Sequence, residues 1–281
     1  DDEKTFALDY RERAPQNATE KMFLNKEGDV IKGLSLNSYL ASGVPGTVKG
    51  MIKAHNLFGS IPIENLIAPA IKIAKDGFTL SNFQATNFNK YKKKFLNGSD
   101  SELIFIKEGG FKEGDIFIQA DLAKSLELIQ SRGQKVFYEG KLADKIVEDF
   151  SQNGGLISSE DLFNYKVYLK DPICGIYKEY DVCSMPLPSS GGVAIIQMLN
   201  IIENFDLKNY SHNSLEYIEL LMNIMSFAYA DRSKYLGDQE FFDAPVENLI
   251  SKEYAERISK KIKSSEELKV EPGIYFYEGD Q

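Results

Sequence analysis

Residues 185–203, MPLPSSGGVAIIQMLNIIE, constrain the fold of this chain more than any other stretch. They begin as a Pro-rich turn, pass through SSGG at residues 189–192, and continue as an apolar run at helical spacing. Residues 180–184, just before them, are predicted to form a short strand. A strand, a tight turn and a buried helix in this order leave free backbone N–H groups at the helix start, where an anion or a closely packed backbone can lie. On its own, the Gly pair favours close packing of the helix on a sheet.

The composition limits the classes of protein to which the chain can belong. With 281 residues, 43% of them hydrophobic, the chain can bury a core as one large domain or as two small ones. Its net charge of −9 argues against nucleic acid as a partner, because such binding requires clustered positive charge. No apolar run approaches the roughly 18 residues that span a bilayer, so we expect no membrane partner. The N-terminal DDEKTFALDY is unlike a secretory signal, and any export signal lies outside this sequence.

The hydrophobic periodicity predicts a helix-rich α+β chain. Helices are expected after the Gly/Pro turn at residues 42–51 and at residues 63–76, 81–95, 121–131, 139–152, 214–236 and 247–262. Pro69 leaves open whether the helix at 63–76 is kinked there or begins near Ala68. Strands are expected at residues 5–10 and 103–107, with two or three more within residues 167–184. Ser81 and Ser158 are predicted N-caps, and Ser158 begins a capping box that opens a short helix.

The longest predicted helix, residues 214–236, is expected to bury one apolar face. That face consists of Leu215, Ile218, Leu221, Met222, Met225 and Tyr229. The chain after the last helix, residues 263–281, lacks periodicity and is expected to be an extended tail.

The two cysteines, Cys174 and Cys183, flank a predicted hairpin, CGIYKEYDVC. A two-residue turn at residues 178–179 would place them opposite each other, so a cross-strand disulfide is conceivable. Two buried free thiols are the favoured interpretation, because cysteine often serves as a small apolar residue. Cysteine usage therefore does not fix the compartment of the protein.

The residues themselves provide no complete catalytic apparatus. His55 and His212 are the only histidines, and neither lies in a context that favours a triad with Ser189 or Ser190. Metal-ligand spacings, a phosphate-binding loop and a dinucleotide fingerprint are all absent from the sequence, so we expect no metal and no cofactor. Arg11 is, from its context alone, a surface ion pair.

Five motifs, taken together and in order, resemble the γ-glutamyltranspeptidase family. They are LDYRERAP at residues 8–15, SGVPGTVKGM at 42–51, PAIKIAKDGF at 69–78, MPLPSSGG at 185–192 and AYADRSKYLGD at 228–238. The resemblance covers nearly the whole chain. It implies the four-layer αββα sandwich of the N-terminal nucleophile (Ntn) hydrolases, of which this helix-rich α+β chain would be the large-subunit portion. Residues 1–262 would belong to a single domain, and the tail at 263–281 would lead to an autocleavage junction.

Family membership would also explain the missing catalytic group. Members of this family are made as precursors that cleave themselves, and the new N-terminal threonine of the small subunit is the nucleophile, with its own amine as the general base. Gln281, at the end of YEGDQ, resembles the residue before that threonine. The resemblance therefore implies a small-subunit partner, no catalytic residue in this chain, and a periplasmic or secreted location. The family also has a Gly-rich segment upstream of the strand before Arg11, so core elements of its fold are expected outside this sequence.

The resemblance changes the interpretation of Arg11. In the family's DFRE-x-AP pattern, this arginine binds the α-carboxylate of the γ-glutamyl donor. A planar guanidinium can hold a carboxylate through two parallel hydrogen bonds, which lysine cannot reproduce. Arg13, which varies in the family, is expected to be structural, and residues 189–192 are expected to be scaffold lining the cleft.

The function that the resemblance implies is transfer of the γ-glutamyl group of glutathione or related amides to water, an amino acid or a peptide. An acylase of the same fold that acts on glutaryl amides is the nearest alternative. A non-catalytic binding or scaffold relative that lacks the nucleophile is an alternative from another class.

Overall fold

The chain divides into two compact units, whose boundary lies within a pair of short strands. The computed structural model describes residues 4–95, 104–264 and 270–272. One unit is Leu8–Tyr168, called here the N-terminal unit, and the other, the C-terminal unit, combines Asp1–Ala7 with Leu169–Gln281. Strand β1 (Ala7–Asp9) pairs with strand β4 (Tyr168–Lys170), and the division falls within these two strands.

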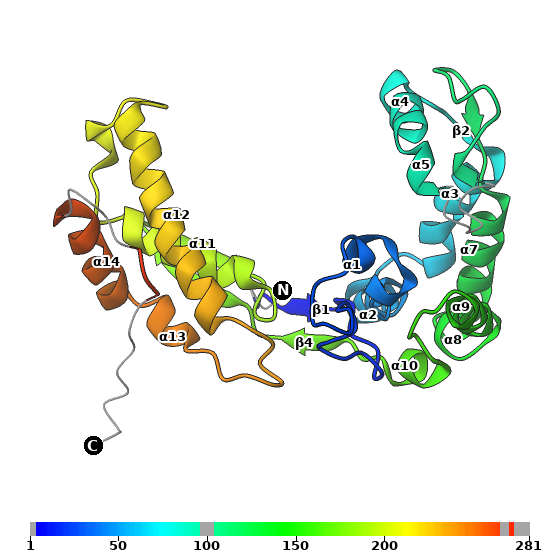
Figure 1. The fold of residues 1–281 in the computed structure, drawn as a ribbon, viewed down its shortest axis with the longest axis horizontal. Coiled ribbons are helices and arrows are strands. Elements are labelled where there is room, and N and C mark those ends of the chain that lie inside the picture. The colour runs from blue at the N-terminus through cyan, green and yellow to red at the C-terminus, as the bar shows by residue number, and fades with distance from the viewer. Residues whose placement is uncertain (1–3, 96–103, 265–269, 273–281) are drawn as a thin grey trace. The chain divides into compact units, whose positions relative to one another are not determined.

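The N-terminal unit is mostly helical. Its further described elements are α1 (Leu34–Asn37), the 3-10 turn η1 (Tyr39–Ala41), α2 (Thr47–Phe58), α3 (Ile63–Asp76), β2 (Phe78–Thr79), α4 (Asn82–Lys90), α5 (Lys92–Phe95), β3 (Ile116–Phe117), α7 (Ala120–Arg132), α8 (Lys135–Tyr138), α9 (Lys141–Gln152) and α10 (Ser159–Asn164). Helices α3 and α7 lie side by side along much of their length (Figure 1). Strands β2 and β3 form a small antiparallel sheet.

Several helix starts in this unit follow directly from the sequence. The predicted caps are confirmed, because Ser81 forms a capping box with Gln84 and Ser158 forms one with Asp161. In each box the serine hydroxyl accepts from the backbone N–H three residues later, while the later side chain accepts from the serine N–H. Gly77 ends α3 at φ 82°, a conformation that glycine adopts without strain.

The strand predicted at residues 103–107 is wrong for its described part, since Ile104 and Phe105 are helical. The ring of Phe105 packs against the rings of Phe88 and Phe117, at centroid distances of 5.5 and 5.8 Å. The β-propensity of an Ile-Phe-Ile run depends on its context, and here the packing of the Phe105 ring goes with a helical backbone.

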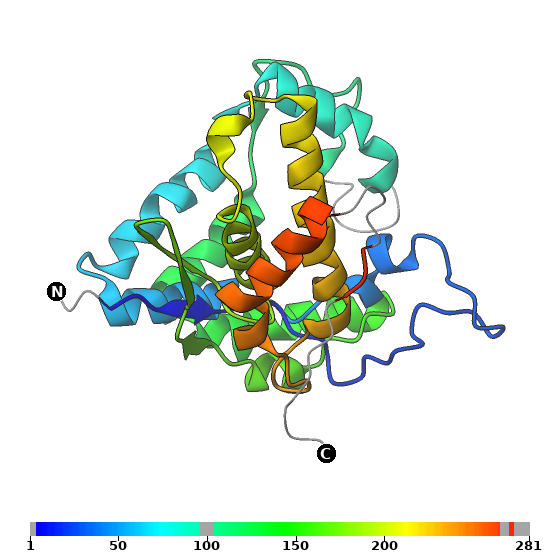
Figure 2. The ribbon, with the colours of Figure 1, turned by 90° about the vertical axis from the view of Figure 1, so that its left-hand side faces the viewer.

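The C-terminal unit contains a hairpin covered by helices. Its further described elements are β5 (Ile173–Tyr177), β6 (Tyr180–Ser184), α11 (Ser190–Ile202), η2 (Leu207–Asn209), α12 (Leu215–Tyr235), α13 (Val246–Leu249) and α14 (Lys252–Ser264). Helix α11 packs against β5, α12 and α14. Figure 2 shows α14, in orange to red, crossing α12.

Helix α11 is the centre of this unit. Val193 and Ile201 are fully buried, and the core around them includes Phe227 of α12 and Ile258 of α14. A buried polar cluster joins the same helices, since the Asp231 carboxylate accepts from Gln197 Nε2 and from the Tyr254 hydroxyl. Burial of these side chains is tolerated because each of them has a hydrogen-bond partner.

The predicted buried face of α12 is wrong. Leu215 is 76% exposed and Met222 is 62% exposed, and Ile218, Met225 and Tyr229 are exposed as well, while Leu221 is only partly buried. The helix instead buries the side formed by Leu220, Ile224, Phe227, Ala228 and Asp231. This helix carries apolar residues on two sides, and the side that contacts α11 includes a carboxylate.

The favoured interpretation of the cysteines is also wrong. Cys174 and Cys183 form a disulfide and are directly opposite each other in the β5–β6 register. Both lie on the exposed side of the hairpin, whereas Gly175 faces α11 and contacts Ile196. The cysteines are therefore not core residues, and the two-residue turn predicted at Lys178 and Glu179 is confirmed.

Two further expectations concern the membrane and the tail. None of the described helices combines the length and the apolar character needed to cross a bilayer. Helix α14 continues to Ser264, and most of the predicted tail lies outside the described residues.

Candidate functional site

Arg11 lies two residues after the end of β1, and both its main-chain N–H and its main-chain carbonyl group form hydrogen bonds. Its N–H donates to Asp9 Oδ1 at 3.2 Å, and its carbonyl oxygen accepts from the Tyr165 hydroxyl at 2.8 Å. Asp9 and Tyr165 are both buried. The backbone at position 11 is thus held locally by Asp9 and, through Tyr165, by a residue far along the chain in the N-terminal unit.

The Gly/Pro motif at the start of α2 packs closely against Tyr10, the residue before Arg11. A Cβ atom on Gly46 would lie 1.8 Å from the Tyr165 hydroxyl oxygen and 2.1 Å from the carbonyl oxygen of Tyr10. A Cβ atom on Gly50 would lie 2.2 Å from the ring of Tyr10. The two glycines are therefore required by the close approach of the strand end to the helix, and this approach holds the residue before Arg11.

Tyr165 is itself held among aromatic and polar neighbours. Its ring stacks on Tyr138 with the centroids 5.8 Å apart, and the Tyr138 hydroxyl donates to the carbonyl oxygen of Pro45 at 2.8 Å. Lys49 Nζ donates to the carbonyl oxygen of Tyr165 at 2.6 Å. Burial raises the pKa of the Tyr165 hydroxyl well above its ordinary value, and the neighbouring Tyr138 and Asp9 raise it further. The hydroxyl therefore keeps its proton and acts as a hydrogen-bond donor at neutral pH.

The side chain of Arg11, in contrast to its main chain, is open to solvent. It is 56% exposed, and its Nε lies 3.9 Å from a carboxylate oxygen of Glu12, itself 64% exposed. An ion pair this long and this exposed contributes little. The planar guanidinium is thus accessible to a carboxylate ligand, which it can bind through two parallel hydrogen bonds.

Arg13 is placed differently. Its guanidinium lies over the ring of Tyr168, 4.9 Å from the centroid, and its backbone forms an antiparallel bridge with Val44. These contacts agree with the structural role predicted for Arg13.

The SSGG segment at the start of α11 lies in the C-terminal unit. A Cβ atom on Gly192 would lie 2.4 Å from the carbonyl oxygen of Met185, whereas one on Gly191 would meet nothing closer than Ser189 Oγ at 3.7 Å. The Ser190 hydroxyl accepts from Arg232 Nε at 2.8 Å, which joins this motif to the AYADRSKYLGD motif. These contacts support the packing interpretation of the segment.

The other residues considered from the sequence are Gln281 and the two histidines. Gln281 lies outside the described residues. His55 Nε2 is hydrogen-bonded to the carbonyl oxygen of Ile61 at 2.7 Å, and His212 is exposed. Within the described ranges, no group of three or more His, Cys, Asp and Glu side chains lies where it could hold a metal ion.

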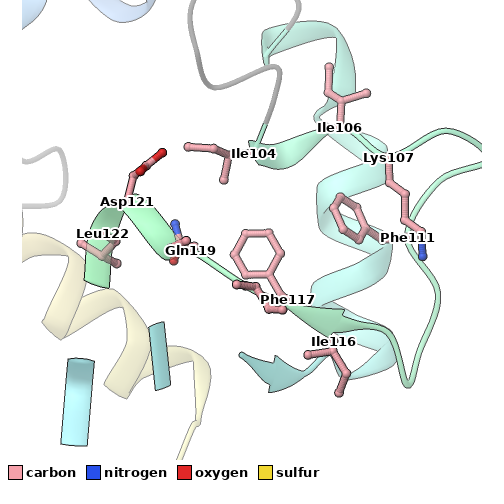
Figure 3. A pocket seen from close by; sticks show the side chains of 11 residues that line it. Ile104, Ile106, Lys107, Phe111, Ile116, Phe117, Gln119, Asp121 and Leu122 are labelled. Atoms are coloured by element: carbon pink, nitrogen blue, oxygen red, sulfur yellow. The ribbon is translucent and has the colours of Figure 1, made fainter. Parts of the chain in front are cut away.

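A pocket of about 490 Å³ lies elsewhere in the N-terminal unit, and Arg11 does not line it. The side chains of Ile104, Phe111 and Phe117 surround it (Figure 3). Its charged side chains are already paired, since Lys107 contacts Asp115 and Asp121 contacts Lys124. The pocket was not predicted from the sequence, and it presents no free charged group to a ligand among its described lining residues.

Comparison with known proteins identifies the family. A model of the gamma-glutamyltranspeptidase family matches residues 1–280. The chain belongs to the gamma-glutamyltranspeptidase family. This result confirms the resemblance inferred from the five motifs.

Relatives of this gamma-glutamyltranspeptidase family member are similar to it over at least nine-tenths of its length in the three cases that follow. The glutathione hydrolase proenzyme of Escherichia coli strain K12 is 44% identical over 99% of this chain and 49% of its own length. The chain thus spans about half the length of the curated relatives that it matches. The crystal structure of Helicobacter pylori gamma-glutamyltranspeptidase is 40% identical, with a TM-score of 0.93 over 99% of this chain and 84% of that one. The acylase ACY 1 proenzyme of Pseudomonas sp. strain SE83 is more distant, at 32% identity over 91% of this chain and 47% of its own length.

These structural relatives confirm the predicted fold class, the helix-rich α+β large-subunit portion of an Ntn-hydrolase αββα sandwich. The family motifs indicated Arg11 but not the group that holds its carbonyl oxygen. Tyr165 is 154 residues away along the chain, so no local pattern could have indicated that contact. Gly46 was the available signal, because a glycine inside a helix-start motif marks a close approach.

Proposed function

We propose that this chain is the large subunit of a γ-glutamyltranspeptidase that cleaves the γ-glutamyl bond of glutathione and related amides. The γ-glutamyl group would pass to water, an amino acid or a peptide through a γ-glutamyl-enzyme. The observation that carries this proposal is the match of almost the whole chain to glutathione hydrolase proenzymes, in which the exposed Arg11 lies within the matched part.

Arg11 is the residue of this chain that would bind the donor. Its exposed guanidinium suits the α-carboxylate of a γ-glutamyl group, and its anchored main chain would fix where that carboxylate lies. Holding the α-carboxylate places the γ-carbonyl at a set distance from the nucleophile, which converts binding energy into orientation.

The nucleophile would come from a small subunit whose N-terminal threonine follows Gln281 in the precursor. The names of the relatives support this two-chain arrangement, since they are described as proenzymes. A periplasmic or secreted location is part of the same proposal. In this arrangement the threonine hydroxyl attacks the γ-carbonyl and its own amine accepts the proton.

Steady-state kinetics on the complete, self-cleaved enzyme test the assignment of Arg11. With a chromogenic γ-glutamyl anilide as donor, Arg11→Ala is expected to raise KM by at least about tenfold, because charge-assisted bidentate contacts are strong. Arg11→Lys should recover only part of that loss. Arg132→Ala, which removes an exposed arginine from the end of α7, serves as the control.

Precursor cleavage, followed on a denaturing gel, should be intact in all of these variants. An unchanged donor KM in a cleaved, active Arg11→Ala enzyme would refute the assignment of Arg11 as the ligand of the donor carboxylate. Activity on glutaryl amides that exceeds activity on γ-glutamyl amides would favour the acylase alternative. A glutaryl group keeps the terminal carboxylate that Arg11 would bind and lacks only the α-amine, so this comparison tests the substrate class and not Arg11. A codon other than threonine after Gln281 would favour the non-catalytic relative.

A further inference from the structure

Helix α10 and the residue after it hold the segment around Arg11 at two points. The Tyr165 hydroxyl donates to the carbonyl oxygen of Arg11 at 2.8 Å. Asp161 Oδ1 accepts from the N–H of Gln16 at 2.8 Å, while Asp161 Oδ2 closes the capping box with Ser158. The segment from Arg11 to Gln16 is therefore attached at both ends to one short, well-capped helix.

Tyr165 is a rigid support. It is 4% exposed, its ring stacks on Tyr138, and its hydroxyl occupies the space that Gly46 leaves by lacking a side chain. Because these neighbours fix the phenol ring, its hydroxyl oxygen has a fixed position relative to the start of α2. A rigid donor of this kind loses little side-chain entropy in holding its acceptor.

The side chain of Arg11 has no comparable support of its own. More than half of it is exposed, and its charged neighbour Glu12 is also exposed. The position of the guanidinium is therefore set mainly by the position of the main chain at residue 11. The contact made by Tyr165 holds the carbonyl group of that residue, next to the Cα from which the side chain projects.

We propose that Tyr165 is a positioning residue for substrate binding: through its hydrogen bond to the Arg11 carbonyl oxygen, it places the Arg11 guanidinium for the donor carboxylate. This inference rests on the proposed function, because it requires Arg11 to be the donor ligand. Tyr165 acts through Arg11 and makes no contact with substrate in this account.

The test is Tyr165→Phe in the complete, cleaved enzyme, with the same γ-glutamyl anilide donor. Loss of one neutral hydrogen bond, about 1 kcal/mol, corresponds to a rise in donor KM of about fivefold. The value of kcat should stay within about twofold, since the nucleophile and its base are on the other subunit. In an Arg11→Ala background, Tyr165→Phe should produce no further rise in KM, because the group that it positions has been removed.

Tyr138→Phe is the matched control. It removes a hydroxyl that is equally buried and hydrogen-bonded, to Pro45 and Lys49, but that does not contact Arg11. It should reduce thermal stability to a similar extent and leave donor KM unchanged. Gly46→Ala places a Cβ atom against both the Tyr165 hydroxyl and the carbonyl oxygen of Tyr10, so it should also raise donor KM.

The outcomes separate the two proposals. If Arg11→Ala raises KM but Tyr165→Phe does not, the positioning role is refuted and the function stands. If Tyr165→Phe raises KM equally with and without Arg11, or if Tyr138→Phe raises it as much, the effect is general destabilisation and the positioning role is again refuted. If Arg11→Ala leaves KM unchanged, the donor-binding role of Arg11 in the proposed function is refuted, and the positioning role of Tyr165 is refuted with it.

Discussion

The carbonyl oxygen of Met185 lies only 2.4 Å from the point where a side chain on Gly192 would begin. This contact brings the end of the β6 segment against the first turn of α11. The neighbouring Gly191 has open space at the corresponding point. Of the two glycines in the SSGG motif, Gly192 alone is therefore required by packing.

Alanine substitutions at the two glycines should differ sharply. Gly192→Ala forces the turn away from the helix and is expected to destabilise the protein by about 1–3 kcal/mol. Gly191→Ala should stay within about 0.5 kcal/mol of the unsubstituted protein. Chemical denaturation of the complete protein measures both, and equal effects would contradict the packing role.

The orientation of α12 can be tested with one buried and one exposed side chain. Ile224, 2% exposed, packs in the core beneath α12, so Ile224→Ala should cost about 2–5 kcal/mol through the cavity that it leaves. Met222→Ala on the opposite side should cost no more than about 0.5 kcal/mol. If denaturant unfolding shows a larger loss of stability for Met222→Ala than for Ile224→Ala, the buried face is the one predicted from the sequence.

The disulfide should be detectable by thiol titration and by stability. This chain, separated and denatured, should show no reactive thiol before reduction and two after it, since Cys174 and Cys183 are the only cysteines of its 281 residues. Replacing both with alanine frees the ends of a short loop in the unfolded chain, and should cost about 2–3 kcal/mol. Two titratable thiols in the unreduced protein would contradict the bond.

Glu203 gives the C-terminal unit a pH-dependent contact. Lys252 and the backbone N–H of Lys178 both donate to its carboxylate, which lowers the pKa of Glu203 below its ordinary value of 4.5. A depressed folded-state pKa means that the unfolded chain takes up the proton first as the pH falls. The stabilisation is therefore complete above about pH 4.5 and is lost as the pH falls through the lower folded value.

Glu203→Gln isolates this effect. The variant should be less stable than the parent at neutral pH, and the difference should shrink as the solution is acidified below about pH 4.5. Thermal unfolding across that range measures the difference. A gap that stays constant with pH would show that the carboxylate makes no ionised contact.

Local sequence signals predicted the helices well because their causes are local. Ser81 and Ser158 cap the helices that their hydroxyls indicate, and α3 runs from Ile63 to Asp76 as its periodicity predicts. Each of these features depends on residues within one or two turns of each other. The paired positions of Cys174 and Cys183 were likewise predictable from the two-residue turn between their strands.

Features decided by distant contacts could not be predicted in this way. On α12 the sequence offers two apolar sides, and the buried one includes Asp231, a residue normally assigned to solvent. Asp231 is tolerated there because Gln197 and Tyr254, from two other helices, donate to it. The same limit applies at the candidate site, where the motif indicated Arg11 and only the fold indicated Tyr165.

The hydrogen bonds that hold position 11 all use main-chain atoms, and this has a consequence for how the family can diversify. Asp9 and Tyr165 bind the N–H and the C=O that every residue except proline possesses. An inherited or engineered change from arginine to another side chain would leave that frame in place. The side chain at position 11 can thus change with the ligand, while Asp9 and Tyr165 are kept to hold the main chain.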